Sequence, residues 1–364
     1  MPIKVLVISD YVDIHSSRPE AEIYIGLAKL NFEIEIMTVP ESPYIDKFEA
    51  AGIRVIKFHP KKKFDRKETS FIRETLINGK YDILHLYNSS ATISGIRAAK
   101  NIRVKIVLYR GVPGHIHWYD PSLYLKYFHP RVDKIVCNSK GVEDVFHKQL
   151  FFNKNKVITI NKGHKLEWYQ HIKPIDRKEL GIPENDFVVI FVGNNRPVKG
   201  VPYLLNAFDH IPAELPIHLL ILGMDMDNEI NMHIVNNSPN RERIHFLGFR
   251  KDALSVVAAS DTLVLSSINL ESITKSVFEA MSLGVPPIIT NLPGNREFVD
   301  ENKSTALVIP IKDSIAIAEA ILKLYNNPEM RKEMGKNCIK HIDTKLSNKT
   351  TVIKMKALYE ELLD

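Results

Sequence analysis

The sequence predicts an α/β protein with two domains, each built on a parallel β-sheet. Three observations lead to this prediction. Short apolar runs alternate with longer segments of helical period along the whole chain. These runs are apolar throughout, which is typical of strands that are buried on both faces of a sheet. The chain has 364 residues, enough for two domains of ordinary size, and the alternation restarts near its middle.

The first series of elements fills the N-terminal part of the chain. Six apolar runs predict strands, at 3–8, 34–39, 54–59, 82–87, 105–109 and 134–138. Segments of helical period separate several of them, at 19–31, about 68–78 and about 90–100. Pro19 suits the first turn of the first of these helices. Strands that are each followed by a helix indicate a parallel sheet covered on both faces.

A second series begins after the Lys- and His-rich stretch 165–173. Strands are predicted at 187–193, 217–223, 244–249, 261–267, 286–290 and 306–310, and helices at 201–208, 253–260 and around 276–284. Because the pattern restarts instead of extending, we predict two Rossmann-like domains that face each other, 1–167 and 168–347. A helix at 348–364, with helical spacing from Val352 to Leu362, is expected to pack back on the first domain.

The composition is that of an ordinary globular protein, with 45% hydrophobic and 25% charged residues. Cys137 and Cys338 have no neighbouring cysteine, which excludes a disulfide scaffold and favours a reducing, cytoplasmic setting. Asp10 interrupts the first apolar run, so this run predicts a strand and not a signal peptide. No stretch approaches the roughly 18 apolar residues of a membrane span. We expect a cytoplasmic protein that would reach a membrane as a peripheral protein on its inner face.

The charge balance is modestly basic. Lys and Arg number 49 against 43 Asp and Glu, a net charge of +6. A net positive charge favours anionic partners, which could be nucleotides, anionic lipid headgroups or nucleic acid, and it does not distinguish among them. Five of the basic residues lie in the segment HPKKKFDRK (59–67). An anionic membrane surface and a solvated loop are both consistent with that segment.

Two carboxylates stand out in the segment 262–299. Glu271 falls in the loop after a predicted strand, and Glu279 lies eight positions later in the following helix. The helix N-terminus between them presents unpaired N–H groups and a partial positive charge, which suit a phosphate. A carboxylate on each side can accept hydrogen bonds from sugar hydroxyls. The alternative is an exposed loop Glu and a Glu on an ordinary amphipathic helix.

The stretch ESITKSVFEAMSLGVPPIITNLPGNREFV resembles the donor-site motif of retaining GT-B glycosyltransferases, family 4 (glycosyl transferases group 1). The matched positions are Glu271, Glu279, Ala280, Met281, Gly284, Pro286, Gly294 and Glu297. The resemblance implies the GT-B fold, two facing Rossmann-like domains with an interdomain cleft. It implies that Glu279 holds the nucleotide ribose. It also implies that Glu271 and the following turn, Ser272, Ile273 and Thr274, hold the donor sugar and phosphates.

The segment FVGNNRPVKGVPYLLNAF (191–208) resembles the second donor element of this family. Gly193, Lys199 and Gly200 match, whereas Asn194 stands where the family has an Arg, and Arg196 follows two residues later. The resemblance implies that Arg196 and Lys199, as catalytic residues with Glu271, neutralise the charge of the departing diphosphate. The alternative is a solvated loop with two surface cations. FLGFRKD (246–252), which contains Arg250, would line the nucleobase pocket.

The sequence departs from the family pattern in several places. The Gly-Gly loop after the first strand is replaced by His15, Ser16, Ser17 and Arg18, of which Ser16 and Ser17 still provide hydroxyls and amides for the donor. Lys275 follows the altered turn 272–274, either as a charge near the phosphates or as an exposed lysine. The stretch KVITINKG carries an extra Lys162, and Arg110 replaces a His that often follows the fourth main strand.

The loop RGVPGHIHWYD (110–120) is the predicted acceptor side. Arg110, His115, His117, Trp118 and Asp120 supply sugar-stacking and proton-handling groups at the end of a strand. Packing or solvation of the two histidines is the alternative. They also suggest a metal, but the sequence places no third ligand, and GT-B enzymes as a class bind the diphosphate without a required metal. We therefore expect neither a cofactor nor a metal.

The leading hypothesis is a retaining enzyme that transfers a sugar from a nucleotide diphosphate sugar to a hydroxyl acceptor. The family association favours a glycan or lipid-linked glycan of the bacterial cell envelope, in lipopolysaccharide or polysaccharide biosynthesis. The alternative is a non-catalytic GT-B protein that binds a nucleotide-sugar or glycan. A nucleic-acid partner is disfavoured because a basic aromatic RNA motif and zinc-finger spacing are missing. A dinucleotide dehydrogenase is disfavoured because no Gly-x-Gly-x-x-Gly follows the first strand.

Overall fold

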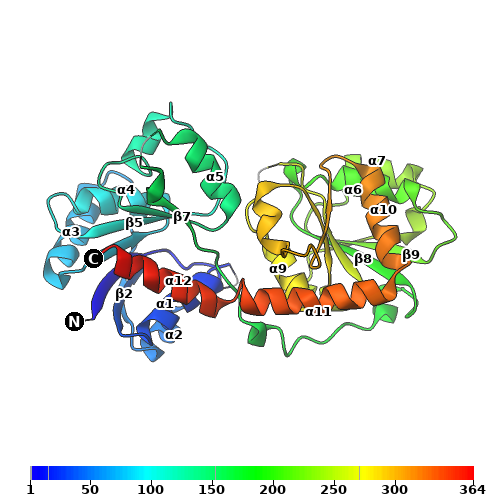
Figure 1. Cartoon of the computed structure of the whole chain (residues 1–364), viewed down its shortest axis with the longest axis horizontal. Coiled ribbons are helices and arrows are strands. Elements are labelled where there is room, and N and C mark those ends of the chain that lie inside the picture. Colours follow the sequence, from blue (N-terminus) through cyan, green and yellow to red (C-terminus); the bar gives the residue numbers. More distant parts are fainter. Residues whose placement is uncertain (1, 15, 152, 270) are drawn as a thin grey trace. The chain divides into compact units, whose positions relative to one another are not determined.

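The computed structural model describes residues 2–14, 16–151, 153–269 and 271–364. The chain divides into two compact units (Figure 1). Unit 1 is Met1–Gly163 together with Asn348–Asp364, and unit 2 is His164–Ser347. The division falls four residues before the boundary drawn from the sequence, 167/168. The last helix, α12 (Asn348–Glu361), is part of unit 1, where it lies beside α1 (Arg18–Ala28).

Unit 1 is built on a seven-stranded parallel sheet in the order β3-β2-β1-β4-β5-β6-β7. Its strands are β1 (Ile3–Ile8), β2 (Phe32–Thr38), β3 (Arg54–Lys57), β4 (Ile83–Leu86), β5 (Lys105–Arg110), β6 (Lys134–Cys137) and β7 (Val157–Thr159). From β1 the chain moves outward to β2 and β3 and then returns to place β4 on the other side of β1. This reversal makes β1/β4 the switch point, where open parallel sheets form ligand crevices at the strands' carboxyl ends.

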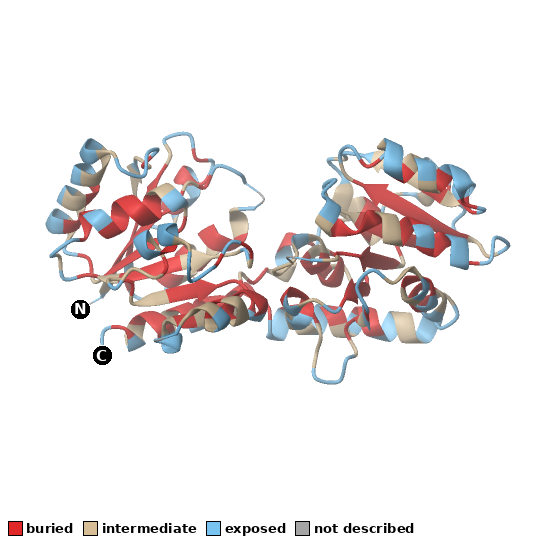
Figure 2. Ribbon diagram, turned by 90° about the horizontal axis from the view of Figure 1, so that it is seen from above, coloured by how far each residue is buried: buried red, intermediate tan, exposed pale blue. Residues whose placement is uncertain are grey.

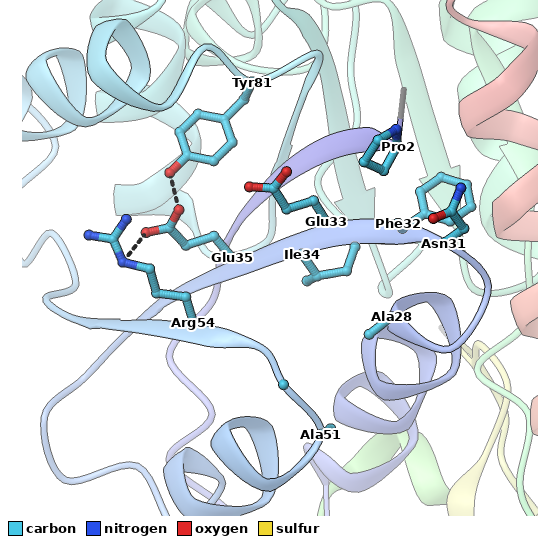
Figure 3. Close-up of a pocket in the computed structure, with 11 residues that line it drawn as sticks. Pro2, Ala28, Asn31, Phe32, Glu33, Ile34, Glu35, Ala51, Arg54 and Tyr81 are labelled. Atoms are coloured by element: carbon cyan, nitrogen blue, oxygen red, sulfur yellow. Dashed lines mark hydrogen bonds and ion pairs between the residues drawn. The ribbon is translucent and has the colours of Figure 1, made fainter.

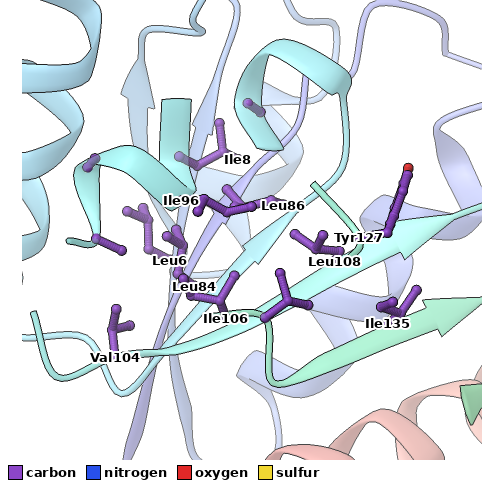
Figure 4. Packing of buried hydrophobic residues seen from close by; sticks show 14 of the residues in the cluster. Leu6, Ile8, Leu84, Leu86, Ile96, Val104, Ile106, Leu108, Tyr127 and Ile135 are labelled. Carbon is purple, nitrogen blue, oxygen red and sulfur yellow. The ribbon is translucent and has the colours of Figure 1, made fainter. Parts of the chain in front are cut away.

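Helices cover both faces of this sheet. Side chains along a strand point alternately to opposite faces, so each strand supplies two cores. One core contains Leu6, Leu84 and Ile106 (Figure 4) and packs against α3 (Arg66–Gly79), α4 (Ser89–Ala98) and α5 (Lys140–Gln149). The other packs against α1, α2 (Ile45–Ala50) and α12. Burial on both faces explains why these strands are apolar throughout.

Unit 2 repeats the architecture with a six-stranded parallel sheet in the order β10-β9-β8-β11-β12-β13. Its strands are β8 (Phe187–Val192), β9 (Ile217–Leu222), β10 (Ile244–Gly248), β11 (Thr262–Leu265), β12 (Pro287–Thr290) and β13 (Leu307–Ile309). Its helices are α6 (Val201–Ala207), α7 (Glu229–Asn237), α8 (Ala253–Ala258), α9 (Lys275–Ser282), α10 (Ser314–Tyr325) and α11 (Pro328–Thr344). The strand order reverses between β8 and β11, which makes this the second switch point.

Figure 2 shows that in each unit the strands are buried and the outer sides of the helices are exposed. The two parallel-sheet α/β domains predicted from the sequence are therefore confirmed. Among the described residues, every helix is too short or too polar to cross a membrane.

A buried polar cluster joins α12 to the sheet of unit 1. His85 on β4 is fully buried, and its Nδ1 lies 3.0 Å from the hydroxyl of Tyr24 on α1 and 2.7 Å from the hydroxyl of Tyr359 on α12. The hydroxyl of Tyr87 lies 2.7 Å from that of Tyr24. Burial lowers the pKa of His85 to about 3, and the positive charge of Lys162 acts in the same direction. His85 is therefore neutral at physiological pH.

This cluster makes the stability of unit 1 depend on pH. An unfolded His titrates near pH 6.5, whereas folded His85 titrates near pH 3. Between these values the unfolded chain binds a proton that the folded chain does not bind. The free energy of unfolding should therefore fall as the pH is lowered through this window, by up to about 1.4 kcal/mol per pH unit. His85→Gln should reduce this slope, measured by urea unfolding at several pH values.

The two tryptophans allow the units to be followed separately. Trp118 lies in unit 1 and Trp168 in unit 2, and the chain has 2 tryptophans in all. Fluorescence in a Trp168→Phe background therefore reports on unit 1. If His85→Gln left the pH dependence unchanged in that background, His85 would not be the group responsible.

Candidate functional site

The candidate site of unit 2 lies at the switch point of its sheet. One loop, 193–200, follows β8, and a second, 266–274, follows β11 and leads into α9. Because neighbouring parallel strands end at the same edge, these loops meet although they are about seventy residues apart in sequence. They carry the residues predicted to bind a nucleotide-sugar donor.

Lys199 and Glu271 form an ion pair between the two loops. The Nζ of Lys199 lies 2.6 Å from Oε1 of Glu271, and the side chains are only 7% and 11% exposed. The hydroxyl of Ser267 donates to the same oxygen at 2.6 Å, and that of Thr274 donates to Oε2 at 2.9 Å. Both carboxylate oxygens are thus hydrogen-bonded, which offsets the cost of burying the charge.

Two of the motif glycines are required by close backbone contacts around this pair. Gly200 has a φ of +62°, and a Cβ atom there would collide with the backbone oxygen of Ser266. A Cβ atom on Gly294 would collide with the backbone oxygen of Glu271. The hydroxyl of Ser266 donates to the carbonyl of Lys199 at 3.0 Å. The glycines therefore let the loops approach until the charged side chains meet.

Glu279 is the fifth residue of α9, and its side chain is 16% exposed. It forms an ion pair with Lys275 at 3.1 Å, across one turn of the helix. Thr274, at the N-cap position, makes no side-chain capping bond, since its hydroxyl donates to Glu271. The first-turn N–H groups of α9 are therefore not capped by this side chain and suit an anion.

The other predicted donor residues lie around the same loops. Gly193 follows β8 directly, and its N–H donates to the carbonyl of Leu222 at 3.0 Å. Arg196 is exposed, and Ser272 and Ile273 are half-buried. Arg250 forms two hydrogen bonds with Asp252, at 2.9 and 2.6 Å, which raise the pKa of Arg250. The structure thus pairs Lys199 with Glu271 but leaves Arg196 outside this contact.

Ser16 and Ser17 belong to unit 1. The backbone N–H of Ser16 donates to the carboxylate of Asp13, and Ser17 is the N-cap residue of α1. His15, in the same predicted loop, lies outside the described residues.

The predicted acceptor loop follows β5 in unit 1. Arg110 donates to the carbonyls of Val112, at 2.8 Å, and Gly114, so the loop folds around its guanidinium group. His115 and His117 are both exposed. His115 has a φ of +58°, whereas the ring of His117 stacks on that of Tyr119 at 5.1 Å. Among the described residues, no hydrogen bond or ring contact joins either histidine to Arg110.

Asp120 has a local structural contact. Its carboxylate accepts from the N–H of Ser122 at 2.9 Å at the start of the short helix η1 (Pro121–Leu125). Hydrogen bonds from Ser122 lower the pKa of Asp120. Within the described part of the chain, no three His, Cys, Asp or Glu side chains are arranged to hold a metal ion.

Sequence reasoning missed a polar group at the switch point of unit 1. Asp10 follows β1, His59 follows β3, and Asn88 follows β4. The side chain of Asn88 hydrogen-bonds to both others. A polar residue two positions after each of β1, β3 and β4 was the available signal.

A hollow of about 440 Å³ lies at the opposite edge of this sheet, where the strands begin. Figure 3 shows Glu35 there between Tyr81, whose hydroxyl donates to it, and Arg54, 3.3 Å away. Ligands of parallel sheets bind at the carboxyl ends of the strands, so this hollow is not the candidate site.

Comparisons with known proteins agree with this architecture. The model of Glycosyltransferase Family 4 matches residues 21–168, and that of Glycosyl transferases group 1 matches residues 172–341. N-acetyl-alpha-D-glucosaminyl L-malate synthase of Bacillus anthracis is 24% identical over 306 residues, covering 82% of this chain and 80% of that protein. UDP-Gal:alpha-D-GlcNAc-diphosphoundecaprenol alpha-1,3-galactosyltransferase of Escherichia coli is 26% identical over 314 residues, with the same coverage.

Solved structures resemble the whole chain. A glycosyltransferase from Rickettsia africae ESF-5 superposes with a TM-score of 0.83 at 16% identity, covering 100% of this chain and 99% of that chain. Anabaena HepE in complex with UDP superposes with a TM-score of 0.80 at 17% identity, covering 99% and 100%. Two parallel-sheet domains and these neighbours define a glycosyltransferase of the GT-B fold. The chain thus carries a Glycosyltransferase Family 4 domain followed by a Glycosyl transferases group 1 domain.

The buried ion pair leads to a stability prediction. Lys199→Met should leave the Glu271 carboxylate buried without its cation and lower the free energy of unfolding of unit 2 by about 3–5 kcal/mol. Adding Glu271→Gln should restore most of this loss, because the neutral amide costs less to bury. The measurement is urea unfolding followed by Trp168 fluorescence in a Trp118→Phe background. A cost no larger than that of Lys332→Met, which removes an exposed lysine of the same unit, would contradict the prediction.

Proposed function

We propose that this glycosyltransferase retains the anomeric configuration and transfers a sugar from a nucleotide diphosphate sugar to a hydroxyl acceptor in cell-envelope glycan biosynthesis. The observation that carries the proposal is the buried pair of Lys199 and Glu271 beside the N-terminus of α9. It holds a cation and a carboxylate at the edge where a parallel sheet binds its ligand.

The donor would be bound by charges of both signs. Lys199 and Arg196 bind the diphosphate together with the uncapped N–H groups of α9. Glu279 accepts hydrogen bonds from the ribose hydroxyls, and Glu271 and the turn 272–274 contact the sugar. Because Glu271 already fixes Lys199 at 2.6 Å, little reorganisation of this cation is needed as charge develops on the leaving phosphate.

The reaction needs no protein nucleophile in this proposal. The nucleotide diphosphate departs from the face of the sugar that the acceptor hydroxyl attacks, so the new bond has the configuration of the old one. The departing phosphate oxygen takes the acceptor proton. Catalysis is then mainly positional and electrostatic, supplied by Arg196, Lys199 and the amides of α9, without a metal ion.

Relatives support a uridine nucleotide and an envelope acceptor. The E. coli relative is named for UDP-Gal and a diphosphoundecaprenol acceptor, and Anabaena HepE has been solved with UDP-glucose. A Rhizobium meliloti relative is named for lipopolysaccharide core biosynthesis. By analogy we propose a UDP-sugar donor, a glycan or lipid-linked acceptor, and peripheral attachment to the membrane.

One observation favours a non-catalytic binding protein as a second candidate. Lys275 follows the altered turn and pairs with Glu279 at 3.1 Å, so it occupies the carboxylate assigned to the ribose. Donor binding must break or share this half-exposed ion pair. Such surface pairs contribute only about 0–1 kcal/mol, so the pair is a small obstacle to donor binding, and the binding protein ranks second.

Nucleotide binding tests the donor site. Thermal unfolding of the full chain is measured with UDP, GDP, ADP and CMP, for the wild type and for Glu279→Ala. At 100 times its dissociation constant, a ligand stabilises the folded state by about 2.7 kcal/mol. UDP should stabilise the wild type, with or without EDTA, and Glu279→Ala should remove most of this effect. Glu319→Ala, an exposed carboxylate of the same unit, should not change it. Failure of all four nucleotides would refute the donor site.

Donor hydrolysis tests catalysis and stereochemistry without an acceptor. A retaining enzyme should release α-glucose first from UDP-glucose, and ¹H NMR can record the anomer before it equilibrates. Lys199→Ala should slow hydrolysis at least about a hundredfold, because removing one preorganised hydrogen-bonding group from the charge that develops in the transition state has an effect of that size. Release of β-glucose would overturn the retaining mechanism. UDP binding without hydrolysis would favour the binding protein.

A further inference from the structure

Three polar residues form one row across the carboxyl edge of the unit 1 sheet. β1 pairs with β4, and β4 with β5, with Ile8, Leu86 and Leu108 in register, so Asp10, Asn88 and Arg110 each lie two positions beyond these paired residues. Adjacent strands are about 4.8 Å apart, so β1 and β5 are separated by roughly 10 Å. The side chains of Asp10 and Asn88 are joined by a hydrogen bond, and Arg110 lies over the ring of Tyr127, which belongs to the core on the α4 side of the sheet. Figure 4 shows the buried residues two positions earlier on these strands: Ile8, Leu86 and Leu108.

Asn88 holds the carboxylate of Asp10 in place. Its Nδ2 donates to Oδ2 of Asp10 at 2.8 Å, and its Oδ1 accepts from the N–H of Asp10 at 3.1 Å. Nε2 of His59 lies 3.1 Å from the same Oδ1 and therefore donates to it. Burial lowers the pKa of His59, so the ring is neutral.

The position of Asn88 suggests a purpose other than stability. It is the N-cap residue of α4, but its side chain makes no capping bond. An Asn at this position usually caps its helix and contributes about 1 kcal/mol. Here the amide positions Asp10 instead, so a fixed carboxylate stands at the switch point where a ligand is expected.

Positive charges gather beside this carboxylate. The segment 59–65, here called the strap, connects β3 to α3 and contacts α4, where the carbonyl of Lys62 accepts from the hydroxyl of Ser94 at 3.2 Å. It carries Lys63, whose side chain is exposed. Burial lowers the pKa of Lys126, and the charges of Lys63 and Arg110 lower it further, against a smaller opposite effect of Asp120.

These cations lack a counter-charge at contact distance. Within the described residues, Lys63, Arg110 and Lys126 form no ion pair with a carboxylate. Arg110 is fixed by two loop carbonyls and lies 5.4 Å from the ring centre of Tyr127. Binding of a phosphate or carboxylate would relieve the repulsion among these like charges.

We propose that this edge binds an acceptor that carries an anionic group next to its reacting hydroxyl. Asp10, positioned by Asn88 and His59, accepts a hydrogen bond from the hydroxyl. Lys63, Arg110 and Lys126 bind the phosphate or carboxylate. The inference rests on the proposed function, since it names the class of acceptor for that reaction.

Hydrogen exchange of the full chain tests the site with defined probes. The probes are glycerol 3-phosphate, methyl phosphate and glycerol, with UDP present at saturation to occupy the donor loops. Glycerol 3-phosphate should slow exchange in the strap and in 121–128, and glycerol should not. The double variant Lys63→Ala/Lys126→Ala should raise the half-saturating concentration of glycerol 3-phosphate at least about tenfold, because hydrogen bonds from charged groups to the phosphate are lost. The exposed pair Lys29→Ala with Lys100→Ala is the matched control.

A second arm tests the carboxylate. The wild type should bind glycerol 3-phosphate more tightly than methyl phosphate, which has no polyol hydroxyl. Asp10→Asn should remove this preference but still bind both phosphates. If Asp10→Asn kept the preference of the wild type for glycerol 3-phosphate, the proposed role of Asp10 would be wrong. Unchanged thermal unfolding of each variant without ligand shows that it is folded.

A third arm separates the two sources of the anion. Vesicles of phosphatidylglycerol in phosphatidylcholine are compared with phosphatidylcholine alone. Protection by glycerol 3-phosphate supports a soluble acceptor, and protection by the anionic vesicles alone supports a lipid-linked one. Protection by neither, or by glycerol and neutral vesicles equally, overturns the proposal. The readout lies in unit 1 and does not need turnover, so failure of the donor site would be seen separately in the UDP titration.

Discussion

The parallel arrangement of the strands is the constraint on which both candidate sites depend. It brings every carboxyl end to one edge of each sheet, and the reversal of strand order opens that edge between β8 and β11 in unit 2 and between β1 and β4 in unit 1. Lys199 meets Glu271 at the first, and Asp10 meets Asn88 at the second. Residues distant in sequence become neighbours because their strands end side by side.

The ion pair of Lys199 and Glu271 is better explained by function than by stability. Burying two charges has a desolvation cost that a well-packed apolar pair would avoid. The chain nevertheless supplies hydroxyls from Ser267 and Thr274 to satisfy the carboxylate, and it uses glycines at 200 and 294 to bring the loops into contact. The result is a cation held in one position, which is the preorganisation that the proposed electrostatic catalysis requires.

The sequence predicted the strands better than the outer helices. The strand 3–8 agrees with β1 to the residue, because a continuous apolar run between polar residues has few alternatives. Helices α10 and α11 were missed although Asp313 caps the first and Pro328 begins the second. Most of α11 is polar, and its buried positions are few. The three-residue β7 is too short to show a periodic pattern of apolar residues.

The contact of His59 with Asn88, 29 residues away, depends on the tertiary fold and leaves no local signal in the sequence.

Lys162, an addition to the family pattern, belongs to an internal ion pair at the same edge of the sheet as the cations of the proposed acceptor site. It forms an ion pair with Glu20, and its Nζ lies 3.9 Å from the ring centre of Tyr109. Burial alone would lower the pKa of Lys162, but Glu20 and Tyr109 raise it, so the ammonium stays charged. Tyr109 faces the α1 and α12 side of the sheet, whereas its neighbour Arg110 continues the row of Asn88 on the other side. Alternation along the strands therefore separates a compensated internal ion pair from cations that have no carboxylate partner, and it is the second group that is suited to a ligand.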